Sequence, residues 1–324
     1  MVAHQQLILR ALLQGEVVSG EDLARRLGVS RAQVNKELSG MRADGLRVVA
    51  RPRRGYRLAA LPDRPLPWAV AAFYPPGAGY PVRFLAETQS TMEAAAAWAR
   101  DGAPEGAVVT TDHQLRGRGR RGRTWSDPPG MSLLSSIVVR PRISPQEAGW
   151  LPLAAAVGAC AAIERVCGLR PEIKWPNDLL VGGRKLAGIL VELTLEEQEI
   201  RHAVIGCGIN VHQPRFPGEL ADRAVSLRQA SGYQGSRAPL LAALVEEILA
   251  AAGQLADDPA ALRARWLERN CTLGREVLAH AAQGTVEGIA ADVDDIGRLI
   301  LRLPDGSTLA MSAGDVTIRG HLGG

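Results

Sequence analysis

Residues 117–123 (GRGRRGR) place four arginines among three glycines, directly before Thr124 and Trp125. Glycine lets the backbone approach an anion closely, and arginine neutralises phosphate charge. A run of this kind is also typical of a solvated loop or a nucleic-acid patch. Its position between strand-like runs, with Trp125 able to stack on a base, favours a site for a nucleotide phosphate.

A second basic position lies in residues 182–190 (GGRKLAGIL), shortly after residues 173–178 (IKWPND). Gly182 and Gly183 predict a two-residue hairpin turn, which would send Lys185 back along the next strand into the domain. Only three of the 38 basic residues are lysines, and Lys174 and Lys185 fall within twelve residues. A buried lysine beside a phosphate can stabilise negative charge in a transition state. An incidental lysine on a surface hairpin is the alternative.

Residues 204–211 (VIGCGINV) predict a buried strand whose glycines leave space for a ligand, with Asn210 at its end. The four cysteines show neither CxxC spacing nor a nearby histidine, which argues against a zinc site or a disulfide framework and indicates a cytoplasmic protein. The N-terminus lacks the pattern of a signal peptide, and no uninterrupted apolar stretch reaches about 18 residues, so no membrane partner is expected.

Residues 1–61 predict a winged helix-turn-helix. Two segments beginning at Ser19 and Ser30 carry helix-start signatures, and two short strands follow around an arginine-rich turn. This segment has eleven basic and five acidic residues, whereas the remainder has 27 and 29, so the basic surplus lies at one end. A recognition helix places its first residues in the major groove. The candidate DNA contacts are Ser30, Arg31, Gln33, Asn35, Lys36, Arg53 and Arg54, with Arg51 also at the turn. A winged helix used only for protein contacts is the alternative.

The rest of the chain predicts further domains, which makes it a multidomain α+β protein. Residues 62–81 contain six prolines and predict a stiff linker. Residues 82–270 alternate strand-like and helical patterns, typical of an α/β domain with a mixed central sheet. Residues 271–324 predict short strands of a small β-barrel.

Four motifs, GRGRRGRTW, KWPNDLL, GRKLAGILVE and GCGINV, resemble in order and spacing those of the biotin–protein ligases. With the N-terminal helix-turn-helix and the C-terminal barrel, which the resemblance makes SH3-like, the whole chain resembles the bifunctional repressor–ligases of that family. The resemblance implies that biotin and ATP, with Mg²⁺, form biotinyl-5′-AMP. Biotin then passes to a lysine on the carrier domain of a biotin-dependent carboxylase. It also implies an operator DNA partner, biotinyl-5′-AMP as corepressor and a homodimer formed on ligand binding. No dedicated metal site is predicted.

The resemblance also implies which side chains form the sites. The biotin pocket comprises Ser90, Thr91, Met92, Gln114, Arg118, Gly119, Arg120, Lys185, Gly188 and Leu190. The adenylate site comprises Arg123, Trp125, Asn177, Asp178 and Asn210. Lys185, Arg118 and Arg120 are the expected catalytic residues, because a carboxylate and a phosphate that repel each other must be screened for in-line attack.

Residues 90–93 carry two further expectations. The family commonly has asparagine where this chain has Met92, and methionine cannot replace the hydrogen bonds of the amide. Ser90 and Glu93 also form the pattern of a helix capping box. Two other functions remain open: a lipoate ligase or octanoyltransferase of the same fold, and a regulator that senses biotinyl-5′-AMP without catalysis.

Overall fold

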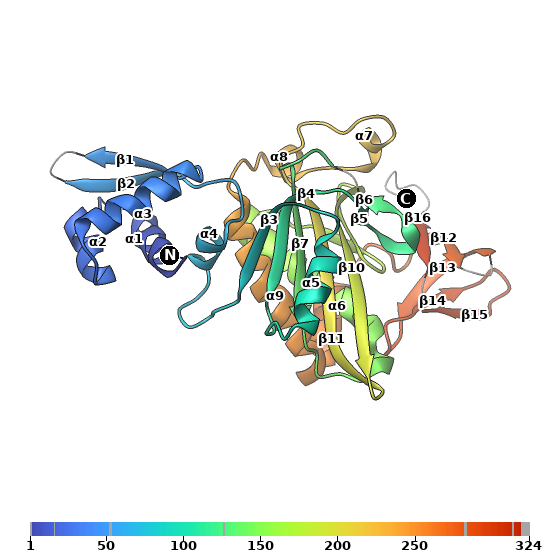
Figure 1. Cartoon of the computed structure of the whole chain (residues 1–324). Helices are drawn as coiled ribbons and strands as arrows, with labels where there is room; N and C mark the ends of the chain where they lie inside the picture. The colour runs from blue at the N-terminus through green and yellow to red at the C-terminus, as the bar shows by residue number, and fades with distance from the viewer. Residues whose placement is uncertain are drawn as a thin grey trace.

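The computed structural model describes residues 2–15, 17–51, 54–125, 127–281, 284–312 and 314–318. At one end of the molecule, three helices are followed by an antiparallel hairpin (Figure 1). These elements are α1 (Val2–Leu13), α2 (Gly20–Leu27), α3 (Arg31–Ala43), β1 (Arg47–Arg51) and β2 (Gly55–Ala60). The side chains of Ser19 and Ser30 accept hydrogen bonds from the backbone N–H groups of Asp22 and Gln33. Both expected helix starts are thereby confirmed, and leucines such as Leu23 and Leu38 form the core.

The proline-rich segment after the hairpin is more than a connector, because it contains the short helix α4 (Pro67–Ala71). Trp68 and Tyr74 are buried, and the apolar run around them packs against α1 and the central domain. The Arg10 guanidinium of α1 donates to the carbonyls of Ala71, Ala72 and Tyr74, the last at 2.7 Å. The segment is therefore packed against α1 on one side and the central domain on the other. Its proline content does not indicate this packing.

A buried arginine secures the start of this segment to the central domain. Arg237 is 1% exposed, and its guanidinium contacts Asp63 at 2.7 Å and Asp112 at 2.8 Å. His212 Nε2 lies 2.8 Å from the Asp63 carboxylate. Burial raises the pKa of Asp63, but hydrogen bonds and charge from His212 and Arg237 outweigh it, so the net pKa lies below the usual range. The N-terminal helices and hairpin are thus joined to the central domain through paired, charged groups.

The central domain is built on one mixed sheet of order β3-β4-β7-β11-β10-β9-β8, which confirms the expected mixed sheet. Only the β3–β4 pair is parallel. The strands are β3 (Val82–Thr88), β4 (Val108–Gln114), β7 (Ser132–Val139), β8 (Glu172–Lys174), β9 (Asp178–Val181), β10 (Arg184–Glu196) and β11 (Glu199–Asn210). Strand β7 is buried throughout because helices cover both faces of the sheet.

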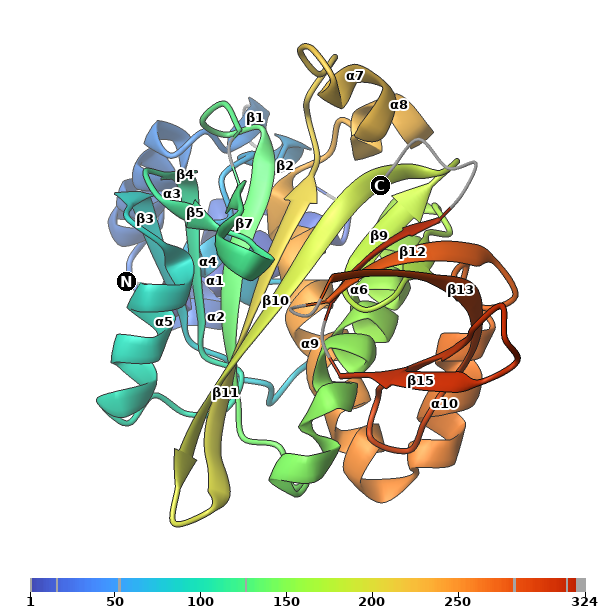
Figure 2. The ribbon, with the colours of Figure 1, turned by 90° about the vertical axis from the view of Figure 1, so that its right-hand side faces the viewer.

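One face of the sheet carries α5 (Thr91–Arg100), and the opposite face carries α6 (Leu151–Cys167) and α9 (Arg237–Asp257) (Figures 1 and 2). Residues 145–167 and α9 are each long and apolar enough to cross a membrane by length and composition. Here both are core helices, since 67% and 61% of their apolar windows are buried. The smaller elements are η2 (Pro145–Trp150), α7 (Leu220–Arg223), α8 (Leu227–Ser231) and α10 (Pro259–Leu267).

The C-terminal part is an antiparallel sheet of order β15-β14-β13-β12-β16 (Figure 1). Its strands are β12 (Glu276–Ala281), β13 (Gly284–Val293), β14 (Leu299–Arg302), β15 (Thr308–Met311) and β16 (Asp315–Ile318). Buried Trp175 donates from its indole nitrogen to the Gly297 carbonyl at 3.2 Å, and Trp150 donates to the Asp294 carbonyl at 3.1 Å. These bonds attach the C-terminal sheet to the central domain beside the site described next.

Candidate functional site

A cavity opens over the middle of β10 and β11, beside the start of α5 and beneath the arginine-rich segment. That segment forms the short pair β5 (Gly117–Arg118) and β6 (Thr124–Trp125), joined by the 3-10 turn η1 (Arg120–Gly122). Residues predicted for the biotin pocket and residues predicted for the adenylate site lie together in this one cavity. Its lining includes Ser90, Thr91, Met92, Gln114, Arg118, Gly119, Arg120, Arg123, Trp125, Asn177, Asp178, Lys185, Gly188 and Leu190. Segments a hundred residues apart in sequence, from Ser90 to Leu190, therefore converge on one site.

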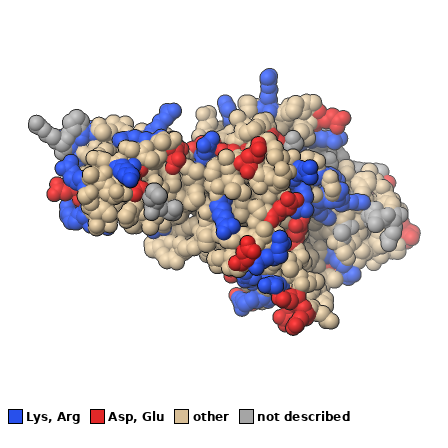
Figure 3. All heavy atoms as spheres, viewed as in Figure 1, with Lys and Arg blue, Asp and Glu red and all other residues tan. Residues whose placement is uncertain are grey.

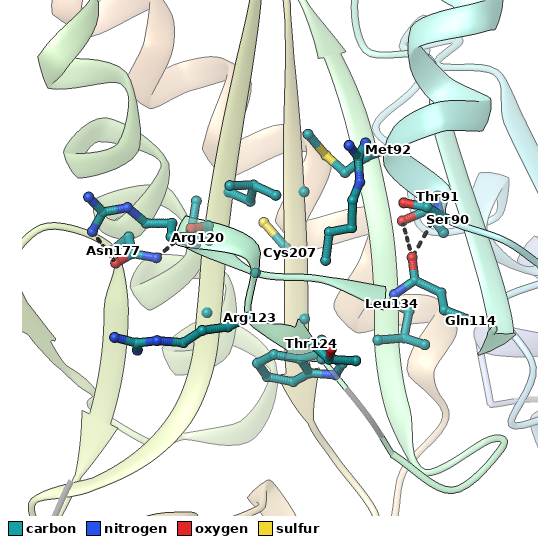
Figure 4. A pocket seen from close by; sticks show the side chains of 18 of the residues that line it. Ser90, Thr91, Met92, Gln114, Arg120, Arg123, Thr124, Leu134, Asn177 and Cys207 are labelled. Carbon is teal, nitrogen blue, oxygen red and sulfur yellow. Dashed lines mark hydrogen bonds between the residues drawn. The ribbon is translucent and has the colours of Figure 1, made fainter. Parts of the chain in front are cut away.

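One side of the cavity is polar, and the Gln114 side chain lies there hydrogen-bonded to the start of α5 (Figure 4). The Gln114 side-chain oxygen accepts from the Thr91 backbone N–H at 2.8 Å and from the Thr91 hydroxyl at 3.1 Å. Ser136 in turn donates to Thr91 Oγ1 at 2.8 Å. The start of α5 is thereby fixed to β4 and β7, so the groups beside it have fixed positions.

The expected capping box at Ser90 is wrong. Ser90 is the N-cap residue of α5, yet its hydroxyl makes no capping hydrogen bond. The Thr91 N–H at the start of the helix donates to Gln114. Glu93 lies near Arg118 at the rim of the cavity, with 3.9 Å between carboxylate and guanidinium. The Ser90 hydroxyl is buried and has no hydrogen-bond partner.

Ser135 is a site residue that the sequence analysis missed. It lies on β7, its hydroxyl is also buried without a partner, and it lines the same cavity as Ser90. An unpaired buried hydroxyl costs about 1–3 kcal/mol, and native proteins rarely leave one. Two such groups in one cavity fit a ligand with polar atoms. The run SLLSSIVV predicts only a buried strand, so no pattern singles out Ser135.

Glycines of β11 provide the space on the floor of the cavity. A Cβ on Gly206 would lie 2.6 Å from Met92 Sδ, and one on Gly208 would lie 2.9 Å from the Trp125 indole. Met92 and Trp125 thus pack directly on the strand backbone. The position of the family's asparagine is occupied here by an apolar thioether, so Met92 supplies packing where an amide would supply hydrogen bonds.

The opposite side of the cavity carries the cations. The Gly182–Gly183 turn is present, with φ of 56° and 73°, as predicted for a hairpin between β9 and β10. Lys185 Nζ lies 2.7 Å from Asp178 Oδ1, and its side chain is 34% exposed, so it faces the cavity mouth rather than the interior. Arg120 donates to Asn177 Oδ1 at 3.2 Å (Figure 4). Arg118 sits further out, 3.4 Å from the Glu192 carboxylate.

A second cavity continues from the first toward the C-terminal sheet. The two share Arg123, Thr124, Trp125, Asn177, Asp178 and Lys185. The second is also lined by Lys174, Asn210, Phe216, Arg223 and His280, of which the sequence analysis predicted only Asn210. Asn210 donates to the carbonyls of Lys185 and Val225, so its amide holds together two segments that line the second cavity.

Lys174 is the more buried of the two neighbouring lysines, at 5% exposed. Burial lowers its pKa, and the nearby Asp178 carboxylate offsets part of that effect. Figure 3 shows basic side chains close together where the central and C-terminal parts meet. Arg121 crosses this boundary, donating to the His280 carbonyl at 2.6 Å. The second cavity therefore suits an anion next to the first.

The candidate nucleic-acid interface lies on α3. Arg31, Asn35 and Lys36 are exposed on this helix, and Arg51 and Arg54 are exposed at the hairpin turn, whereas Arg53 lies outside the described residues. Ser30 caps the helix, and Gln33 donates to the buried Glu37 at 2.8 Å. Some predicted contacts therefore already have partners within the domain.

Comparison with known proteins decides the family. Residues 84–210 match the Biotin/lipoate A/B protein ligase family, residues 4–57 match the HTH domain, and residues 272–319 match the Biotin protein ligase C terminal domain. The Bifunctional ligase/repressor BirA of Bacillus spizizenii is 35% identical over 306 residues, covering 92% of this chain and 93% of the relative. The chain belongs to the biotin protein ligase family.

Other members of the biotin protein ligase family agree with this assignment. The Bifunctional ligase/repressor BirA of Escherichia coli is 30% identical over 316 residues, covering 96% of each chain. The structure of the Aquifex aeolicus biotin protein ligase in complex with biotin and ATP superposes with a TM-score of 0.62 at 25% identity. That match covers 74% of this chain and 98% of the Aquifex chain.

Proposed function

We propose that this protein is an ATP-dependent biotin–protein ligase that also represses transcription of biotin-synthesis genes. It forms biotinyl-5′-AMP, transfers biotin to a lysine of a carboxylase carrier domain, and uses biotinyl-5′-AMP as its corepressor. The convergence of all four ligase motifs on two joined cavities supports the catalytic half. The fused helix-turn-helix with its basic surplus supports the DNA-binding half.

The two cavities divide the substrates by chemistry. The first offers unpaired hydroxyls from Ser90 and Ser135 to the ureido ring of biotin, and apolar cover from Leu190 and Met92 to its thiophane ring and valeryl tail. The second, with Arg123 and Lys174, suits the phosphates of ATP. Lys185 stands at the junction, where the biotin carboxylate meets the α-phosphate.

In the first step the biotin carboxylate attacks the α-phosphate, and pyrophosphate leaves. Lys185 and Arg120 reduce the repulsion between carboxylate and phosphate and stabilise the negative charge on the oxygens of the α-phosphate. In the second step the amine of the carrier lysine attacks the acyl carbon of the anhydride, and AMP leaves. Binding both reactants next to each other supplies most of what such a transfer needs, so no nucleophilic side chain of the ligase is required.

Mg²⁺ is expected to enter with the nucleotide. Among the described residues, no group of three or more His, Cys, Asp or Glu side chains could hold a metal ion. Asp178 is the one carboxylate among the described residues lining the first cavity, and it is paired with Lys185. The site therefore fits Mg²⁺ held mainly by the ATP phosphates, which is how this ion commonly binds.

Incubation of the protein with biotin, labelled ATP and a carboxylase carrier domain tests the ligase. We expect biotin on the carrier and release of labelled AMP. Transfer of octanoate or lipoate in preference to biotin would identify a lipoate-type enzyme. Binding of biotinyl-5′-AMP without any transfer would identify a sensor.

Replacing Ser135 separates binding from stability. Ser135→Ala is expected to weaken biotin affinity by about tenfold while leaving the melting temperature of the free protein unchanged or higher, since it removes an unpaired buried hydroxyl. Ser136→Ala is the matched control, because Ser136 donates to Thr91 and its loss should lower stability. Calorimetric titration with biotin and thermal unfolding check both; unchanged biotin affinity in Ser135→Ala would exclude that contact.

Operator binding is expected to depend on the ligand through dimerisation. One domain with a surplus of six charges makes few phosphate contacts, and salt screens them strongly. Two copies on a palindromic operator double the contacts. Biotin plus ATP should therefore raise both operator affinity in a gel shift and the dimer fraction in sedimentation. A protein that stays monomeric with ligand, or binds the operator equally without it, would contradict this coupling.

The architecture fits these roles. We propose that the β1–β2 hairpin acts as the wing of residues 1–61, that residues 62–81 connect to the ligase domain of residues 82–270, and that residues 271–324 form an SH3-like barrel. We also propose a cytoplasmic location, where both ATP and DNA are found. The four cysteines are free, and burial raises the pKa of Cys160 and of Cys207 to about 12, which keeps both as thiols.

A further inference from the structure

Tyr56 links the β1–β2 hairpin to the recognition helix. Its backbone is held by two hydrogen bonds to Val18, N–H to carbonyl in each direction, at 2.8 and 2.9 Å. Its ring lies against Gly20 at the start of α2, where a Cβ would stand 3.4 Å away. The Arg42 guanidinium lies over the ring, 5.9 Å from its centroid. Backbone and ring are thus both held from within the domain.

The hydroxyl of this ring reaches an exposed side chain of α3. Tyr56 donates to the side-chain oxygen of Asn35 at 2.6 Å. Asn35 stands one turn after Arg31 on the exposed surface of the helix. Because its oxygen is turned toward Tyr56, its amide nitrogen is the atom left to face outward. An exposed asparagine would otherwise rotate freely between the two orientations.

This orientation matters for base recognition. An asparagine that presents both oxygen and nitrogen forms a bidentate pair with adenine, accepting from N6 and donating to N7. An asparagine that presents only nitrogen is a donor, which suits guanine N7 and O6 and does not satisfy the adenine amino group. The other amide on this part of the helix, Gln33, already donates to Glu37, so Asn35 is the amide whose nitrogen remains to donate to a base.

We infer that Tyr56 is a positioning residue for DNA specificity: it holds Asn35 as a hydrogen-bond donor and so directs it to an acceptor-rich base edge, that of guanine, in preference to adenine. The inference rests on the proposed DNA binding and adds the residue that selects one base of the operator. Tyr56 does not touch the base itself; it acts through Asn35.

The test is a selection of bound duplexes from a random library, using the full-length protein with biotin and ATP. Asn35→Ala first identifies the operator position that Asn35 reads, as the position whose preference is lost. Tyr56→Phe keeps the ring and removes only the hydroxyl. At that position we expect adenine to gain about fivefold over guanine relative to the unaltered protein, the size of one hydrogen bond.

Three readouts separate this from a general structural effect. Tyr56→Phe should retain the melting temperature, the affinity for non-specific DNA and the carrier biotinylation rate. It should have no effect in the Asn35→Ala background. Tyr233→Phe, which removes a hydroxyl that donates to the Ser236 carbonyl far from α3, is the matched control and should leave the base preference unchanged.

The outcomes are distinguishable. Operator binding with an unchanged preference in Tyr56→Phe, or adenine already preferred by the unaltered protein at the Asn35 position, would overturn the inference alone. Failure of the unaltered protein to bind any duplex would overturn the proposed DNA binding and this inference together.

Discussion

Lys185→Ala is expected to lower biotin-dependent pyrophosphate release by about a hundredfold or more, the loss typical of one electrostatic partner in a transition state. The lysine lies at the junction of the two cavities, where the reacting carboxylate and α-phosphate meet. Its removal also leaves the Asp178 carboxylate, now 2.7 Å from the ammonium, unpaired beside the incoming phosphate. The measurement is the single-turnover rate of biotinyl-5′-AMP formation.

Arg184→Ala is the control for this experiment. Arg184 is the preceding cation on β10 but is not among the residues that line either cavity. It should keep a near-normal rate, which would show that position rather than total charge matters. A Lys185→Ala enzyme that turns over normally would remove Lys185 from the mechanism.

Arg120→Gly is expected to release the reactive adenylate. Arg120 bonds to Asn177 across the cavity from the start of α5, so it holds the glycine-rich segment over the site (Figure 4). Without this contact the segment should open, and biotinyl-5′-AMP should escape before it meets a carrier. We expect biotin on the lysines of an unrelated protein such as serum albumin, at a level at least about tenfold above that of the unaltered enzyme.

Arg121→Gly offers a matched comparison in the same turn. Arg121 contacts the C-terminal sheet instead of the cavity and has φ of 54°, where glycine is well tolerated. It should retain the intermediate. If albumin stays unlabelled by Arg120→Gly while adenylate still forms, the retaining role of Arg120 is excluded.

The motifs predicted from sequence which residues gather at the site, because each motif combined a backbone requirement with a chemical group. The Gly182–Gly183 turn, for example, predicted the hairpin that brings Lys185 to the site, although Lys185 lies at the cavity mouth and not in the interior. The polar detail could not be predicted in this way. Ser90 has the spacing of a capping box but makes no capping hydrogen bond, and the start of α5 is held instead by Gln114, more than twenty residues away, which binds the Thr91 N–H.

Residues recruited by long-range packing were the ones that sequence missed. Ser135 and Lys174 sit within strands whose pattern reads only as buried, and their chemistry depends on strands that pair beside them. The proline-rich segment of residues 62–81 also differs from what its sequence predicts. Its prolines indicate stiffness, whereas Trp68 is buried because α4 packs against α1 and α9.

The ion pairs around Arg237 give the molecule a fixed internal distance. Because Asp63 is held by a buried guanidinium that also binds Asp112, the proposed recognition helix α3 is not joined to the central domain by a flexible linker. In a dimer formed through the ligase domains, the separation of the two recognition helices would then be set by the protein. Such a repressor would bind only operators whose half-sites have one spacing. Insertion of a few base pairs between the half-sites should therefore abolish binding even when both half-sites are intact.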